Sequence, residues 1–334
     1  MIFSRAQANC ALSLVSCCLL VAVGKAEERS AEDWFQLMIQ AQQELSYAGT
    51  ISYFDGQEMT TLWYSHIVEH GEVHERVTNL NGRPRSFIRE GGSVFLQLGA
   101  DDELLKLRDK LEREQVSSTF QPPFGKIDDT YTIEFDGKDR IAGRAAACIS
   151  MIPNEGDRYS IHLWIDEGTY ALLRYDMRDD DRRPIKIWQF TEFETGELDR
   201  DKHSFSGHAH PNLEMHIKQS ENQDEPIEES DVNWHLGWIP KGFQRFSSQG
   251  LDDSIGSEAA RHVMYSDGMV PLMVIVEPIS ESHNQLTAET ISGPTVVVSH
   301  TVQDNDGKSQ LVTVVGDLPA KTVWRVARGV KFDP

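Results

Sequence analysis

The fold class is indicated most directly by the run Arg158-Tyr159-Ser160-Ile161-His162-Leu163-Trp164-Ile165. Every second residue from Tyr159 to Ile165 is apolar, and Arg158, Ser160 and His162 occupy positions between them. A period of two is typical of a β-strand with one buried face and one wetter face. An Asp166-Glu167-Gly168 turn and a second strand-like run, Ala171–Met177, follow. The pattern therefore predicts antiparallel strands joined by short turns.

The same pattern of strand-like runs and short turns extends over most of the region before residue 195. Strands are predicted at Thr50–Phe54, Met59–Val68, Ser93–Leu98, Tyr131–Phe135, Ile141–Ile152 and Ile185–Phe193. Turns are predicted at Asp55-Gly56, His70-Gly71, Asn81-Gly82, Gly91-Gly92, Asp136-Gly137, Pro153–Asp157 and Asp179–Arg183. Three helices are expected, over 31–46, Asp101–Val116 and Leu213–Lys218, the first because Trp34, Leu37, Met38, Ala41 and Leu45 recur at helical spacing.

A second domain is predicted after an acidic linker at 221–231, since 334 residues suit two domains better than one. The proposed units are residues 27–220 and 232–334. Strands are expected at Gln244–Ser248, Arg261–Ser266, Leu272–Glu277, Thr295–Val302 and Leu311–Val315, with a hairpin turn at Asp304–Gly307. Asp317-Leu318-Pro319 opens a closing helix with an apolar stripe and, beside it, a basic stripe of Lys321, Arg325 and Arg328.

Residues 1–26 are interpreted as a secretory signal peptide, because Arg5 precedes the apolar run Ala11–Gly24 and Gly24-Lys25-Ala26 ends in small residues. A lipoprotein-type cleavage at Cys17 is the alternative, and the apolar run that continues beyond Cys17 argues against it. Removal of the leader leaves Cys148 alone, so no intramolecular disulfide is expected. Cys148 lies in an apolar run and is expected to be a buried, unreactive thiol.

The charge balance excludes several functions. Lys and Arg number 32 against 53 Asp and Glu, a formal net charge of −21. Such a chain repels phosphate backbones, so a nucleic-acid partner is not expected. The sequence also has no Gly-x-Ser-x-Gly, phosphate loop, GxGxxG or His-Glu-x-x-His motif. Without a nucleophile, cofactor or metal signature, the chain is predicted to be a binding protein and not an enzyme.

Histidines form the main alternative to that interpretation. His66, His70 and His74 are spaced by four, and His66 and His74 could face each other across a hairpin. A second group lies in the His-rich stretch 203–216. A metal-dependent hydrolase would use such residues, but no Cys or carboxylate pattern accompanies them. Solvated surface histidines are the simpler interpretation.

Several local patterns together resemble the MucB/RseB family of periplasmic regulators. In the first half these are Trp34 with its helix, Ile141-Ala142-Gly143-Arg144, Arg158–Asp166 and Leu173-Arg174. In the second half they are Trp238-Ile239-Pro240-Lys241-Gly242-Phe243, Met264-Tyr265-Ser266-Asp267-Gly268 and Val314-Val315-Gly316-Asp317-Leu318-Pro319. Each motif is weak alone, whereas the ordered set covers nearly the whole chain after the leader.

The resemblance implies an α+β fold. The large N-terminal domain would be a curved, unclosed antiparallel β-barrel with helices on its concave side, similar to the lipoprotein carriers, and the C-terminal domain a smaller mixed α/β unit. It also implies a periplasmic protein that binds the periplasmic segment of a membrane anti-sigma factor, shields it from a site-1 protease and so represses the envelope-stress sigma factor. Lipopolysaccharide or another acylated ligand would release it, and homo-oligomers are expected.

The resemblance further implies that the C-terminal domain supplies the partner-binding surface. The candidate residues are Trp238, Pro240, Phe243, Tyr265 and Asp267. Two alternatives stay open from the residues themselves. These side chains could instead build the core of the small domain, and the same first domain could serve a periplasmic lipid or lipoprotein carrier. The presence of a second domain favours the regulator.

Overall fold

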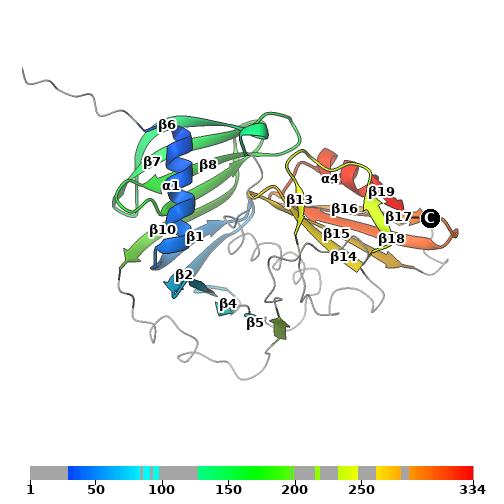
Figure 1. The fold of residues 1–334 in the computed structure, drawn as a ribbon, viewed down its shortest axis with the longest axis horizontal. Helices are drawn as coiled ribbons and strands as arrows, with labels where there is room; N and C mark the ends of the chain where they lie inside the picture. The colour runs from blue at the N-terminus through cyan, green and yellow to red at the C-terminus, as the bar shows by residue number, and fades with distance from the viewer. Residues whose placement is uncertain are drawn as a thin grey trace, which may run out of the picture.

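The computed structural model describes residues 29–82, 86–90, 93–97, 127–196, 198, 215–218, 232–246, 261–279 and 286–333. These residues form two β-rich domains, each with one α-helix against its sheet (Figure 1). No helix among them has the length and apolar character needed to cross a bilayer. The predicted leader 1–26, the predicted helix 101–116 and the linker 221–231 lie outside the described residues.

The first domain is an open antiparallel sheet of eleven strands in the order β11-β5-β4-β3-β2-β1-β10-β9-β8-β7-β6. Strands β11 and β6 are its edges and do not pair with each other, which confirms the unclosed antiparallel architecture. The strands are β1 (Tyr47–Phe54), β2 (Met59–Glu69), β3 (Glu72–Asn79), β4 (Ser86–Glu90), β5 (Ser93–Gln97), β6 (Tyr131–Ile141), β7 (Arg144–Pro153), β8 (Ser160–Asp166), β9 (Leu172–Arg178), β10 (Pro184–Thr195) and β11 (Met215–Lys218). A short 3-10 turn, η1 (Ile127–Asp129), precedes β6.

Helix α1 (Ala31–Glu44) crosses one face of this sheet (Figure 1). Ser30 and Asp33 form a capping box, in which each side chain accepts the other's backbone N–H, and this fixes where the helix begins. Trp34, Phe35 and Met38 are buried on the side that meets the sheet. The predicted helix over 31–46 is therefore confirmed to within two residues at its end.

The second domain is a six-stranded antiparallel sheet in the order β13-β14-β15-β18-β17-β16. Its strands are β13 (Gln244–Phe246), β14 (Arg261–Ser266), β15 (Pro271–Pro278), β16 (Thr287–Ser292), β17 (Thr295–Gln303) and β18 (Ser309–Gly316). Helix α4 (Ala320–Ala327) lies across β17 and β18, and the short strands β12 (Trp234–Leu236) and β19 (Val330–Phe332) pair beside it. The five strands predicted here are all confirmed, whereas the exposed, polar β16 gave no alternating signal and was missed.

One predicted turn of the first domain is wrong. Asp136-Gly137 does not reverse the chain, because β6 continues through it with a bulge between Phe135 and Gly137. The reversal falls at Ala142 and Gly143, whose φ angles of 47° and 78° suit a two-residue hairpin turn. Gly137 has a φ of 112° and supplies the backbone freedom that a bulge requires.

The predicted helix at Leu213–Lys218 is also wrong. Met215–Lys218 forms β11, which pairs with Ser93–Leu96 of β5. A segment of this length has a weak intrinsic preference, and ladder hydrogen bonds to a sheet edge outweigh it.

A continuous buried core joins the two domains. It contains Trp34 and Met38 of α1, Leu163 of β8, Val274 of β15 and Val323 of α4. Alternate residues of β8 (Ile161, Leu163 and Ile165) are fully buried in it. The two sheets are therefore packed against each other and are not merely tethered.

Candidate functional site

The candidate site is the junction of the two domains, where Asp267 occupies the turn between β14 and β15. Its Oδ1 accepts the backbone N–H groups of Met269 and Val270, both at 2.9 Å. Its Oδ2 accepts the Tyr131 hydroxyl at 2.9 Å and Arg158 Nη1 at 3.0 Å, both from the first domain. With four donors and 2% exposure, this carboxylate is a buried tie between the domains.

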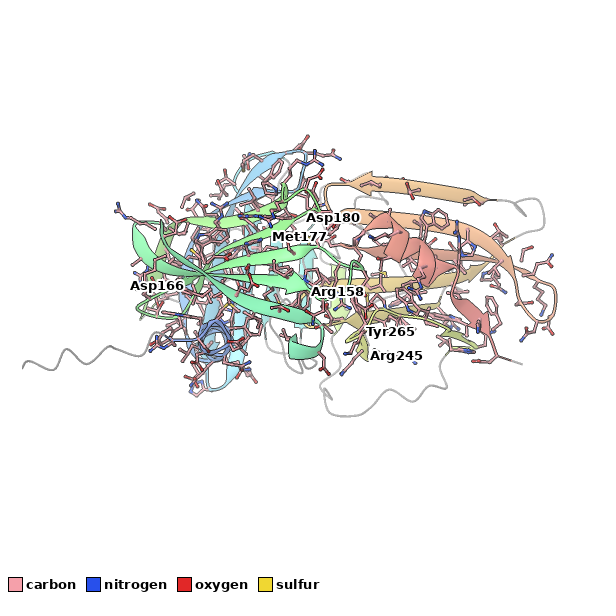
Figure 2. All side chains as sticks on the ribbon, turned by 90° about the horizontal axis from the view of Figure 1, so that it is seen from above. Arg158, Asp166, Met177, Asp180, Arg245 and Tyr265 are labelled. Atoms are coloured by element: carbon pink, nitrogen blue, oxygen red, sulfur yellow. The ribbon has the colours of Figure 1, made fainter. Side chains whose placement is uncertain are left out.

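Arg158 is the first-domain half of this tie and lies at the end of the sheet that faces Tyr265 and Arg245 (Figure 2). It is 3% exposed. Besides Asp267, its guanidinium donates to the Asp157 carboxylate and to the backbone oxygen of Lys241, and it lies 5.2 Å from the Phe243 ring centroid. Arg158 therefore binds three elements of the junction at once, and its charge is directed inward rather than toward a ligand outside.

Burial governs the electrostatics of this junction. Desolvation, with the Asp267 charge as the second cause, raises the pKa of the Tyr131 hydroxyl well above its usual value. Tyr131 therefore stays protonated and donates its hydrogen bond throughout the physiological range. Burial likewise raises the pKa of Asp157, and the neighbouring Arg158 charge opposes that shift.

A second buried ion pair crosses the junction. Lys186 of β10 donates to Asp317 at 3.0 Å, and Asp317 also accepts the Thr295 hydroxyl at 2.6 Å. Asp317 follows β18 and precedes α4, so this pair links the first sheet to the start of the helix. Lys186, Asp317 and Thr295 are each at most 6% exposed as whole residues.

Two glycines of the second domain lie in close contact with the first domain. A Cβ at Gly242 would lie 2.6 Å from Cγ2 of Thr130, and a Cβ at Gly293 would lie 1.5 Å from the backbone oxygen of Asp55. Both glycines have positive φ angles, of 88° and 56°. Glycine is therefore required at both positions, by conformation and by close contact.

The predicted partner-binding residues divide into two groups. Pro240, Phe243 and Asp267 are buried at the junction, and the last two meet the same Arg158 side chain. Trp238 and Tyr265 are half-buried and do not share that contact. The Trp238 ring carries the Arg325 guanidinium 3.7 Å from its centroid, and burial raises the pKa of Tyr265, with Arg245 opposing the shift.

Tyr131, Lys186 and Asp317 lie at the junction but were not predicted as functional residues from the sequence. Lys186 stands between two isoleucines of a predicted strand, and a lone cation in such a run is the one signal that pointed to a buried pair. Tyr131 and Asp317 carry no comparable signal, because their partners lie 136 and 131 positions away.

The histidine expectations are partly wrong. His66 faces Glu75 across the β2–β3 hairpin, and His74 faces Ile67. His66 is buried at 3% exposure, with Nδ1 3.3 Å from Glu75 Oε1 and Nε2 2.8 Å from the Gln42 backbone oxygen. No group of His, Cys, Asp and Glu in the described part of the chain is arranged to hold a metal ion. The stretch 203–214 lies outside the described residues.

Comparison with known proteins identifies both halves of the chain. The model of the MucB/RseB N-terminal domain matches residues 30–221, and that of the MucB/RseB C-terminal domain matches residues 228–331. The sigma factor AlgU regulatory protein MucB of Pseudomonas aeruginosa is 28% identical over 315 residues, 93% of this chain and 94% of that protein. The sigma-E factor regulatory protein RseB of Haemophilus influenzae is 28% identical over 94% of this chain and 95% of its own length.

Solved structures agree with these relatives. A crystal structure of MucB in complex with MucA(peri) is similar with a TM-score of 0.70 and 26% identity, over 91% of this chain and 99% of that one. Another crystal structure of MucB is similar with a TM-score of 0.67 and 25% identity, over 91% of this chain and 98% of that one. The similarity covers both domains.

Proposed function

This chain belongs to the MucB/RseB family, and we propose on that basis that it binds the periplasmic segment of a membrane anti-sigma factor and so represses an envelope-stress sigma factor. The observation that carries the proposal is the pairing of both family domains in one chain that is similar to a MucB structure with MucA(peri) bound. The relatives are named as regulatory proteins of sigma factors. The two-domain architecture also favours a regulator over a lipid or lipoprotein carrier, which the first domain alone would not distinguish.

The mechanism we propose is occlusion. A site-1 protease must accept its substrate in an extended form, and a segment held on another protein is withheld from it. A firm surface that spans both domains suits this task, because a preformed site loses less entropy on binding. The buried Arg158–Asp267 and Lys186–Asp317 pairs hold such a surface in place.

The two groups of candidate residues have different proposed roles. Trp238 and Tyr265 are half-buried and are proposed to touch the partner with their exposed parts. Pro240, Phe243 and Asp267 are buried and are proposed to position that surface. Truncation of Trp238 or Tyr265 is then expected to weaken partner binding without a large loss of stability, whereas truncation of Phe243 or Asp267 is expected to affect both.

Further properties follow from the family as proposals. The protein is expected to act in the periplasm, to form homo-oligomers and to be released by lipopolysaccharide or another acylated ligand. An acyl-dependent release is checked by titrating lipopolysaccharide and its deacylated form into the preformed complex. Equal release by the deacylated form would contradict an acyl pocket.

Protease protection tests the proposed function directly. The recombinant periplasmic domain of the anti-sigma factor from the same organism is incubated with its site-1 protease, with and without this protein. Cleavage is expected to slow as this protein saturates the substrate. Heat-unfolded protein at the same concentration is the control, and an unchanged cleavage rate at saturating native protein would contradict the proposal.

A further inference from the structure

Among the described residues, no strand pairs with the outer side of the edge strand β16, which is called its open side below. It ends the six-stranded sheet, and its six residues pair with β17 without a break in register. Two other edges of the described strands differ: β13 has three residues, and β6 is bulged at Gly137 and exposes Lys138, Asp139 and Arg140. Proteins use short edges, bulges and charges to prevent unwanted pairing. β16 has no bulge, and its single charged side chain, Glu289, is engaged by Trp324.

The hydrogen-bond pattern shows which groups β16 presents at its open side. The N–H of Thr301 donates to the Leu286 oxygen at 3.0 Å, so these two residues form a hydrogen-bonded pair. Hydrogen-bonded and non-hydrogen-bonded pairs alternate along an antiparallel ladder. The backbone N–H and C=O groups of Thr287, Glu289 and Ile291 therefore point away from β17, toward the open side.

The side chains of these three residues lie on the face that α4 covers. Glu289 shows this, because its carboxylate accepts the Trp324 Nε1 hydrogen bond from α4. Ile291 is 53% exposed on this face, and Leu286 just before the strand is 40% exposed. A strand added to β16 would therefore find apolar contact at both ends of the pairing.

The same face of α4 is cationic. Lys321, Trp324 and Arg328 are spaced by three and four residues and share one side of the helix. The Arg328 guanidinium lies 4.9 Å from the Trp324 ring centroid, and the side chains of Lys321 and Arg328 are exposed. Within the described residues neither cation forms an ion pair. In a chain with a formal net charge of −21, this is a local basic surface. Arg328 adjoins β16 through Trp324, and Lys321 Nζ lies near Gly156 of the first domain.

We infer that β16 receives an extended, acidic segment of the anti-sigma factor as an added β-strand, with its carboxylates directed to Lys321 and Arg328. The inference rests on the proposed function and assigns a surface to it. Main-chain hydrogen bonds to Thr287, Glu289 and Ile291 supply affinity, and the charges select acidic side chains at alternate positions. A second copy of this chain would fit less well. The one acidic side chain of its β16 strand is Glu289, which already accepts the Trp324 hydrogen bond.

Two variants test the two halves of the inference by calorimetric titration with the recombinant periplasmic domain of the anti-sigma factor. Ile291→Pro removes an outward N–H and leaves the β17 ladder intact, and Ile291→Val is its matched control. Lys321→Glu/Arg328→Glu reverses the basic surface, and Arg140→Glu/Arg182→Glu makes the same charge change at exposed positions of the first domain. We expect each test variant to weaken Kd at least about tenfold, while the controls stay within about twofold.

Two further readouts identify the binding mode. The loss caused by the charge reversal is expected to shrink at high salt, whereas the loss caused by Ile291→Pro is not. Hydrogen exchange is expected to slow at the amides of Thr287, Glu289 and Ile291 when the complex forms. Melting temperatures of the free variants show whether each remains folded, and the hydrogen-exchange experiment on wild-type protein does not depend on any variant.

The outcomes separate this inference from the proposed function. If the wild-type protein does not bind the periplasmic domain, the proposed function fails. If it binds but the variants bind equally well and the β16 amides are not protected, the function stands and the β16 inference is overturned. If protection of β16 appears without the partner and disappears on dilution, a second copy occupies the edge and the assignment of the occupant is overturned.

Discussion

At the residue scale, Asp267 and Arg158 are the side chains on which the junction depends most. Each is nearly excluded from water, and each satisfies several hydrogen-bonding groups of the other domain. A buried ion pair is not by itself a source of large stability, because its desolvation opposes its attraction. Loss of one partner is costly, however, since it leaves an uncompensated charge in the interior.

Arg158→Met is therefore expected to destabilise the protein by about 3–5 kcal/mol. Urea denaturation measures the change in the free energy of unfolding. Arg183→Met is the matched control, because Arg183 pairs with Asp179 and Asp181 at the surface and its loss should cost about 1 kcal/mol or less. A similar loss in both variants would contradict the role given to Arg158.

Asp166 provides a pH-dependent test in the first domain (Figure 2). Burial alone would raise the pKa of this carboxyl, but hydrogen bonds from Arg144 and Thr169 outweigh burial and the net pKa lies below its ordinary value. Because the unfolded chain then takes up a proton at higher pH than the folded protein, the stabilising contribution is complete above about pH 4 and is lost as pH falls further.

Comparison of wild type with Asp166→Asn between pH 6 and pH 3 checks this expectation. The difference in unfolding free energy should narrow toward the acid end, because protonated Asp166 no longer differs in charge from asparagine. A difference that is constant over this range would show that the charge of Asp166 does not contribute. Asp180→Asn, at an exposed carboxylate on a first-domain turn, is the control for the substitution itself.

At the element scale, the loop from Trp238 to Phe243 is positioned by a contact between domains. Gly242 lies against Thr130, whose hydroxyl donates to the Ile127 oxygen at 3.0 Å and keeps the methyl group directed at the loop. Gly71, in the β2–β3 turn, has a similar φ of 83°, but nothing lies within 4 Å of the position that a Cβ would occupy there. The two glycines therefore differ in contact and not in conformation.

Gly242→Ala is expected to cost more stability than Gly71→Ala, by about 1–3 kcal/mol for the overpacked contact. Thermal unfolding of both variants gives the difference. Thr130→Ser removes the methyl group that would clash and keeps the hydroxyl, so it should recover part of the loss in the double variant. Equal destabilisation by the two alanines, or no recovery by Thr130→Ser, would show that the clash is relieved in another way.

At the scale of the whole molecule, the shared core and the two crossing ion pairs couple the domains. Two domains that unfold independently give separate transitions, whereas coupled domains unfold together. Separation of the domains would leave the buried carboxylates of Asp267 and Asp317 without their partners Arg158 and Lys186.

We therefore expect one cooperative thermal transition for the full chain, with calorimetric and van't Hoff enthalpies in agreement. Arg158→Met/Lys186→Met should separate it into two transitions, because both crossing ion pairs are then lost. Scanning calorimetry measures this, with Arg183→Met as the surface control. Two transitions in the wild-type protein would contradict the coupling.

Local structure and family membership could both be inferred from the amino-acid sequence. The alternation in β8, the helical spacing of Trp34 and Met38, and the His70-Gly71 turn are local signals, since each depends on neighbours within a few residues. The ordered motifs led to the MucB/RseB family before any contact was known. The strands of the second domain were predicted for the same reason, because buried strands need apolar side chains wherever they pair.

The contacts between distant residues could not be inferred in this way and depend on the packed three-dimensional fold. Arg158 and Asp267 are 109 positions apart, and no pattern in either segment indicates the other. The strand β11, the bulge in β6 and the exposed β16 were hidden for a related reason, because a sheet edge or a bulge is stabilised by the ladder it joins and needs no alternating pattern of its own. The periodicity of a segment shows which of its side chains face the core and which face solvent. The junction and the open edge at β16 depend instead on how the folded sheets are assembled.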